Sequence, residues 1–414
     1  MKKFTMFVSI LLLATLLFGS AMMEEQTLKA QFADPTDAAY LEYYFNVTLP
    51  EGPVSAASLQ KALSQIVGNE VKLSKDTDVF KALVEAAELG QLAETYSSEK
   101  AIARLKVYGI TGVPTDIARY LACALDAYLI PSAVAQDMIA SGTLDSSAAV
   151  SILMNVAEAN GIARNYLGKI SDSDILQRIA NAFDGYTLYS DGNLDAIGAM
   201  AVQQRASTGY NLKKDTDDAR FLPSRTIQYG HSDEIHLKQL VVLLNSEGID
   251  AKLQLEPKVS IYEYLLDWGP VPEPSPYYMV LEFSNGFYLA YAVEYDAKFE
   301  FDSPEDLLKF DGIINKYSKK NDTNQAKGST IKLIKGAWWQ PLYSATFNPD
   351  PSAYIEIVDC VLEEDGYSIH PFSLVETKAN LINTLESLSG LDVIQRTIFV
   401  NNAFHRYLTG SDYQ

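Results

Sequence analysis

The residue types that could do chemistry gather in YGHSDEIHLKQLVVLLNSEGIDAK, residues 229–252. His231, Asp233 and His236 lie close together there, just before an apolar-periodic segment. The two histidines are five residues apart, so they do not share one helical face as the i, i+4 pair of a zinc hydrolase does. We expect no metal and no other cofactor at this position. His231 and His236 remain candidates for binding a ligand.

The elements that must position these residues are a helix and several strands. Apolar residues recur at helical spacing from Ile235 to Leu244, and Gly248 is suited to end that helix. Strand-like stretches follow at residues 251–260 and 277–296, the second with Asn285-Gly286 as a two-residue hairpin turn. A helix followed by antiparallel strands predicts an α+β domain over residues 220–345.

This order resembles the transglutaminase-like core of the papain-like superfamily. In that family a helix that begins with the nucleophilic cysteine leads to a Gly-Ile-Pro-Ala-Arg strand entry, which is similar to Gly-Ile-Asp-Ala-Lys at residues 248–252. The resemblance places Asp233 at the cysteine position and Tyr278 at the histidine position. It places Asp296 loosely at the third, orienting acid.

Those residue types disable acyl transfer. A cysteine works at a helix N-terminus because the helix dipole and a nearby imidazolium stabilise its thiolate, whereas an aspartate there is a poorer nucleophile. Tyrosine has a reference pKa of about 10 and cannot replace the histidine as general base at neutral pH. We therefore predict no enzyme at Asp233, Tyr278 and Asp296. In the simpler interpretation Asp233 only caps a core helix.

The first half of the chain contains a helical repeat. Short helices are predicted to begin at Ser55, Ser97, Asp145 and Asn193, at intervals of 42, 48 and 48 residues. Between them, three segments that begin with a hydroxyl residue and an acid, at residues 77, 115 and 173, have apolar residues at helical spacing. Such self-similarity predicts stacked helix pairs, and we assign residues 30–212 to this module.

The repeat resembles S-layer homology modules, which attach bacterial envelope proteins to the wall. In that family the second helix opens with a Thr-Arg-Ala-Glu type motif, whose arginine helps bind anionic polysaccharide. The corresponding residues 97–100, 145–148 and 193–196 contain no arginine. The resemblance therefore implies the fold but not the anionic ligand. A generic helical array is the alternative.

The net charge and the N-terminal targeting pattern limit which partners and which location we expect. The formal charge of -20 excludes a polyanionic nucleic acid as partner. Lys2 and Lys3 precede an apolar run from Phe4 to Phe18 and a small-residue site at residues 19–21, so residues 1–21 are predicted to be a signal peptide. We expect a secreted or cell-envelope protein without membrane contact after cleavage. A single uncleaved anchor is the alternative.

The remaining candidates are two thiols and an aromatic pair. Cys123 and Cys360 could pair outside the cytoplasm or remain two separately buried thiols. Cys360 could also be assembled with His370 or His405, but no helix N-terminus supports such a site. Trp338 and Trp339, near Tyr343, could stack on sugars or pack in the core.

The last part of the chain, residues 346–414, is predicted to add a strand and two helices, at residues 374–389 and 391–409. The expected architecture is thus an all-α helical repeat module followed by an α+β transglutaminase-like domain. The first functional hypothesis is a non-catalytic envelope or surface protein that binds a cell-wall component or another surface protein. The second is a secreted hydrolase or acyl transferase with a rearranged site.

Overall fold

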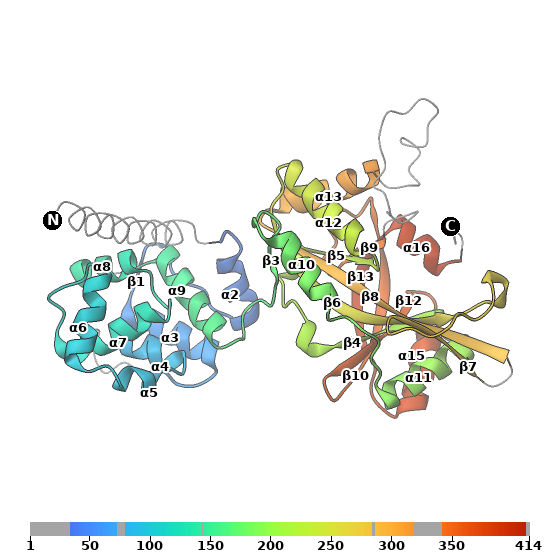
Figure 1. Cartoon of the computed structure of the whole chain (residues 1–414), viewed down its shortest axis with the longest axis horizontal. Coiled ribbons are helices and arrows are strands. Elements are labelled where there is room, and N and C mark those ends of the chain that lie inside the picture. Colours follow the sequence, from blue (N-terminus) through green and yellow to red (C-terminus); the bar gives the residue numbers. More distant parts are fainter. Residues whose placement is uncertain (1–33, 73–78, 143, 284–285, 318–341, 411–414) are drawn as a thin grey trace, which may run out of the picture. The chain divides into compact units, whose positions relative to one another are not determined.

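The computed structural model describes residues 34–72, 79–142, 144–283, 286–317 and 342–410. The chain divides into two compact units, Met1–Arg164 and Asn165–Gln414 (Figure 1). The predicted signal peptide and the pair Trp338-Trp339 lie outside the described residues. Within the described ranges, no helix has both the length and the apolar character needed to cross a membrane.

The first unit is helical in its described part. Its elements are α2 (Asp37–Phe45), β1 (Pro53–Val54), α3 (Ala56–Val67), α4 (Val79–Ala86), α5 (Gly90–Glu94), α6 (Ser98–Val107), α7 (Thr115–Asp126), α8 (Ser132–Ser141), β2 (Leu144–Asp145) and α9 (Ser146–Ala159). The two short strands pair antiparallel. Alanine and leucine side chains of α4, α7 and α9 are fully buried, as expected of helices that share a core.

Three of the four predicted short helices begin where the sequence pattern places them. Ser55, Ser97 and Asp145 are the N-caps of α3, α6 and α9, and each side chain accepts a hydrogen bond from the backbone N–H three residues later. The fourth is α11 (Gly192–Gln203), whose cap is Asp191. This helix and α10 (Ile175–Phe183) belong to the second unit and pack on its strands.

The second unit is built on a closed antiparallel barrel of eight strands. The barrel order is β6, β4, β11, β10, β13, β9, β5 and β8, and it closes because β8 also pairs with β6. These strands are β4 (Gly209–Lys214), β5 (Thr226–His231), β6 (Ala251–Glu263), β8 (Phe287–Phe301), β9 (Leu342–Ala345), β10 (Tyr354–Glu364), β11 (Tyr367–His370) and β13 (Ile394–Asn401). Three further strands pair with barrel strands: β3 (Gly168–Lys169) with β6, β7 (Tyr278–Phe283) with β8 and β12 (Phe372–Leu374) with β10.

The predicted transglutaminase-like fold is wrong. The predicted helix exists as α12 (Glu234–Ser246), and the predicted strands exist as β6, β7 and β8. However, β6 and β8 pair along 13 positions and close a barrel that strands from the C-terminal part complete. Local patterning identified the strands, but closure depends on pairing between segments far apart in the sequence.

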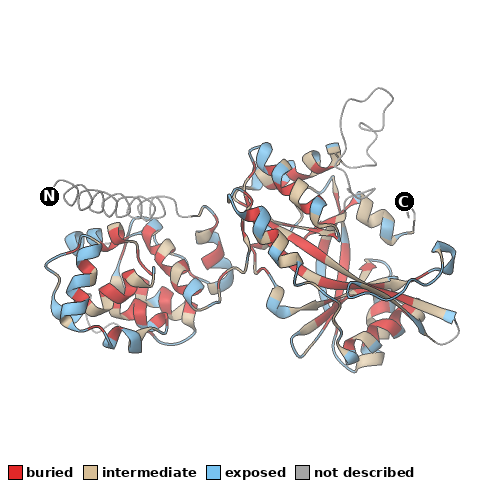
Figure 2. Ribbon diagram, viewed as in Figure 1, coloured by how far each residue is buried: buried red, intermediate tan, exposed pale blue. Residues whose placement is uncertain are grey.

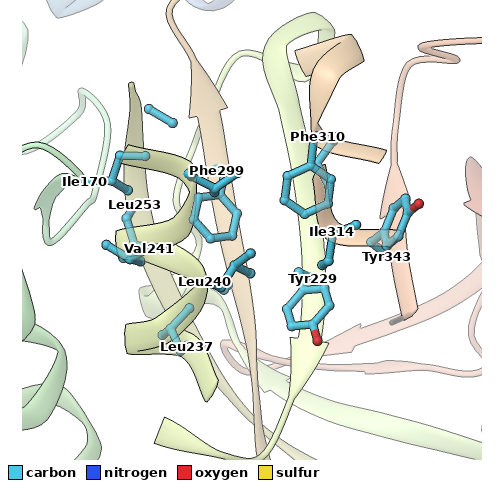
Figure 3. Packing of buried hydrophobic residues seen from close by; sticks show 14 of the residues in the cluster. Ile170, Tyr229, Leu237, Leu240, Val241, Leu253, Phe299, Phe310, Ile314 and Tyr343 are labelled. Atoms are coloured by element: carbon cyan, nitrogen blue, oxygen red, sulfur yellow. The ribbon is translucent and has the colours of Figure 1, made fainter. Parts of the chain in front are cut away.

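The outer surface of the barrel is apolar and covered by helices. One cluster packs α10, α12 and α13 (Pro304–Tyr317) on β5, β6 and β8; a second packs α11 and α15 (Lys378–Ser389) on β4, β6, β8 and β10. Figure 3 shows Leu237, Leu240 and Val241 of α12 next to Leu253 and Phe299. Figure 2 shows strand segments beneath these helices as buried. Odd-numbered residues of β6 and β8 face the helices, so even-numbered ones face the barrel interior.

The C-terminal part contains four strands, β10 to β13, where the prediction had one, and its second predicted helix is mostly a strand. Helix α15 confirms the first predicted helix, but residues 394–401 of the second form β13 between β10 and β9. Only α16 (Asn402–Leu408) is helical there. The run Ile394–Asn401 contains isoleucine, threonine, phenylalanine and valine, which favour strands.

Candidate functional site

Asp233 caps a helix. It is the N-cap residue of α12, and its side chain accepts a hydrogen bond of 2.7 Å from the backbone N–H of His236. The rings of His231 and His236 stack with centroids 4.3 Å apart, and both side chains are buried. Tyr229 places its hydroxyl 2.8 Å from Nε2 of His236. The structure therefore brings the two candidate histidines together, inside the core under α12.

The three positions carried over from the transglutaminase resemblance do not meet. Asp233 lies on the helix-covered side, where its carbonyl accepts a hydrogen bond from Tyr295. Asp296, the next residue on β8, faces the barrel interior. Tyr278 also faces the interior, but on β7, where it pairs with Ala292. The part of the chain that the structure describes contains no metal-binding group of three or more His, Cys, Asp or Glu residues.

The cysteines are two separately buried thiols. Cys123 lies in α7 of the first unit, and Cys360 lies in the core beneath α15. Burial and the neighbouring Asp359 raise the pKa of Cys360 to about 12. Cys360 faces the helices, whereas His370 on the paired strand faces the barrel interior. A Cys360–His370 site is therefore excluded.

The barrel interior is a network of buried charges that the sequence analysis missed. Asp296 lies 2.7 Å from Nζ of Lys258 and 2.5 Å from Nζ of Lys213. Glu256 pairs with Lys298 at 2.6 Å and with Lys213 at 3.4 Å. Burial alone would raise the pKa of Asp296, but Lys213 and Lys258 hold that pKa well below its ordinary value. The signal was the alternation of polar and apolar residues in β6, where Lys252, Gln254, Glu256, Lys258 and Ser260 occupy every second position.

The segment between β4 and β5 donates backbone hydrogen bonds to two carboxylates of the barrel interior. Between β4 and β5, the backbone N–H of Ala219 donates to Glu256 at 2.9 Å and that of Leu222 donates to Glu300 at 2.6 Å. Glu300 also pairs with Lys252 at 3.1 Å. Ion pairs and backbone donors thus satisfy these carboxylates, as burial requires.

The opposite end of β6 carries a group of aromatic residues, which we call the aromatic rim: Tyr262, Tyr264, Trp268 and Tyr278. Trp268 is 59% exposed, and its ring contacts those of Tyr264 and Tyr262 at centroid distances of 5.6 and 6.4 Å. The hydroxyl of Tyr264 donates to the carbonyl of Gly269 at 3.1 Å, which fixes the turn containing η4 (Leu266–Trp268).

Small residues on β8 allow the rim to form. Tyr262 pairs with Ala290 and Tyr278 pairs with Ala292, so the two tyrosines lie on either side of β8 with only methyl groups between them. The rings of Tyr262 and Tyr278 therefore approach each other over these alanines. Burial raises the pKa of both phenols, so both remain protonated donors at neutral pH.

One position further into the barrel the lining becomes polar. We call Asn211, Ser260 and Glu294 the polar floor: Ser260 Oγ lies 2.8 Å from Oδ1 of Asn211 and 2.7 Å from Oε2 of Glu294. Ser260 pairs with Ala292, which itself pairs with Tyr278, so floor and rim are adjacent on the same sheet face. The combination of exposed rings and hydroxyl, amide and carboxylate groups is typical of a ligand site.

No protein-family model, curated protein or solved structure matches the chain.

Proposed function

We propose that this chain is a secreted envelope or surface protein that binds an uncharged polysaccharide at the aromatic rim. The observation that carries this proposal is the exposed face of Trp268, held by Tyr262 and Tyr264 beside the polar floor. A pyranose ring has an apolar C–H face that packs on an aromatic ring and hydroxyls that need hydrogen-bond partners. The aromatic rim supplies a ring on which the sugar face can pack, and the polar floor supplies the hydrogen-bond partners.

Charge favours an uncharged ligand. The chain has a formal charge of -20, and the residues around the rim include Asp267 and Glu273, both exposed. Glu294 in the floor adds another carboxylate beside the rim. A polyanion would meet repulsion at each of these carboxylates, whereas the hydroxyls of a neutral polymer would donate hydrogen bonds to them.

The first unit lacks arginine at residues 97–100 and 145–148, which correspond to the polysaccharide-binding positions of S-layer homology modules. At the junctions where wall-binding S-layer homology modules carry arginine, Ser97 and Asp145 serve as helix caps. Nζ of Lys100 lies 3.7 Å from the ring centroid of Tyr96. We propose that this unit has the envelope-anchoring architecture of such modules but does not hold anionic wall polymer tightly.

Affinity electrophoresis tests the ligand class. Native gels would contain hydroxyethyl cellulose, glycol chitin or carboxymethyl cellulose, so that the first and third polymers share a backbone and differ in charge. The proposal predicts retarded migration in at least one uncharged polymer and none in the anionic one. Unchanged migration in both uncharged polymers, or retardation by carboxymethyl cellulose alone, would overturn it.

A further inference from the structure

The barrel interior contains a hydroxyl, an imidazole and a carboxylate in one hydrogen-bonded row. Ser368 Oγ lies 3.0 Å from Nε2 of His370, and Nδ1 of His370 lies 2.8 Å from Oδ2 of Asp359. Ser368 and His370 are two residues apart on β11 and therefore share a face, while Asp359 comes from the paired β10. The two ring nitrogens thus have different partners, with the carboxylate on one and the hydroxyl on the other.

This order of groups is the one that activates a serine. A carboxylate on Nδ1 fixes the tautomer in which Nε2 is free to accept a proton, and it stabilises the imidazolium that results. Nε2 is within hydrogen-bond distance of the hydroxyl whose proton it would take. We propose that Ser368 is a nucleophile, with His370 as its general base and Asp359 as the residue that orients His370, and that this row hydrolyses short-chain carboxylic esters.

A lysine lies opposite the nucleophile on the neighbouring strand. Lys213 on β4 is the direct partner of Ser368 in the β11–β4 pairing, so both side chains point into the barrel. Its ammonium group is held by Asp296 and Glu256, which use two of its three N–H donors. The third N–H can stabilise the oxyanion that forms when Ser368 attacks a carbonyl carbon.

Solvent reaches the same sheet face beside the row. Glu363 pairs directly with Ser368, Arg396 pairs directly with Asp359, and Glu363 and Arg396 form an ion pair. The side chain of Glu363 is 39% exposed and that of Arg396 is 47% exposed. Ser368 and His370 themselves are 5% and 8% exposed. A small ester fits this limited access better than a polymer chain, so we assign short acyl groups as the substrate class.

The reaction balances with water as the only co-reactant. Ser368 Oγ bonds to the carbonyl carbon while its proton passes to Nε2 of His370. The ester C–O bond then breaks, and the leaving alcohol takes that proton. Water attacks the acyl-serine, gives a proton to His370, and releases the carboxylic acid as Ser368 recovers its hydrogen. The proposal does not depend on polysaccharide binding, because neither step uses the aromatic rim.

Probe labelling tests the proposal without any variant. The full chain is incubated with a fluorophosphonate probe and with 4-nitrophenyl acetate, and the adduct is located by peptide mass spectrometry. The expected result is a single adduct on Ser368 and ester hydrolysis above the rate without protein. A chain with no adduct on Ser368 after prolonged labelling would overturn the assignment, whatever its rate of ester hydrolysis.

Variants distinguish ester hydrolysis by Ser368, His370 and Asp359 from hydrolysis by other reactive groups on the protein surface. We expect Ser368→Ala to lower 4-nitrophenyl acetate hydrolysis at least 100-fold, and Asp359→Asn to lower kcat and shift its pH profile. The matched control is Ser344→Ala, which removes another buried serine hydroxyl, on β9, but leaves Ser368, His370 and Asp359 intact. Equal rates in wild type and Ser368→Ala, or equal losses in Ser368→Ala and Ser344→Ala, would contradict the proposal.

Discussion

Asp296 on β8 lies between Lys213 on β4 and Lys258 on β6, inside a barrel whose apolar surface faces outward. The strands therefore place charge on one face and core residues on the other. Because a buried ion is costly unless it is paired, the three side chains depend on one another. This dependence has direct consequences for stability.

Removing Asp296 should destabilise the second unit strongly. Asp296→Ala leaves two buried ammonium groups without this carboxylate, and breaking a buried pair typically costs about 3–5 kcal/mol. Urea denaturation measures the change in the free energy of unfolding. The control is Asp267→Ala on the exposed turn near Trp268, expected to change it by less than about 0.5 kcal/mol. Similar small changes in both variants would show that the network contributes little.

Asp195 on α11 should make stability decrease as pH rises. Burial raises its pKa to about 6, against an ordinary value of 3.8, so the folded state binds the proton more tightly. The stability that this tighter proton binding contributes to the folded state is fully present below pH 4 and is lost as pH rises through 6. Asp195→Asn should therefore gain stability relative to wild type between pH 4 and pH 7.5, as measured by urea midpoints. A difference between the two proteins that is constant with pH would contradict this assignment.

Asp233 should matter for folding and not for binding. Asp233→Ala removes the cap of α12 and should cost about 1 kcal/mol, whereas Asp233→Asn should be nearly neutral because asparagine also caps helices. Thermal denaturation of both variants measures the difference, and affinity electrophoresis should give wild-type migration for both. Loss of ligand binding in a folded Asp233→Asn protein would return this residue to the candidate site.

Individual helices and hairpins could be predicted from the sequence, because residues close in the sequence determine where each one begins and ends. The N-caps Ser55 and Ser97, the end of α12 before Gly248 and the β7–β8 hairpin all follow from neighbouring residues. The barrel could not be predicted, because it needs pairings between distant segments, such as that of β4, at residues 209–214, with β11, at residues 367–370. No local periodicity contains that pairing.

The site was missed for the same reason. Tyr262, Trp268 and Tyr278 come from three elements, and only the pairing of β6, β7 and β8 brings them together. Ser368 and His370 could have been noticed as a same-face pair on one strand, but Asp359 joins them only through the β10–β11 pairing. The polar alternation in β6 and at residues 294–300 of β8 was a local sign that a strand face was not an ordinary core face.

The binding of uncharged glycan at the aromatic rim is tested most directly by titration calorimetry with chitohexaose and cellohexaose. Wild type is compared with Trp268→Ala and with Tyr43→Ala, which removes another exposed aromatic ring in the first unit. Losing an aromatic anchor typically costs about 2 kcal/mol, which is more than tenfold in Kd. We predict that wild type and Tyr43→Ala bind at least one hexasaccharide equally, and that Trp268→Ala binds it at least tenfold more weakly. Equal affinity of wild type and Trp268→Ala, or no binding of either sugar by wild type, would contradict the account.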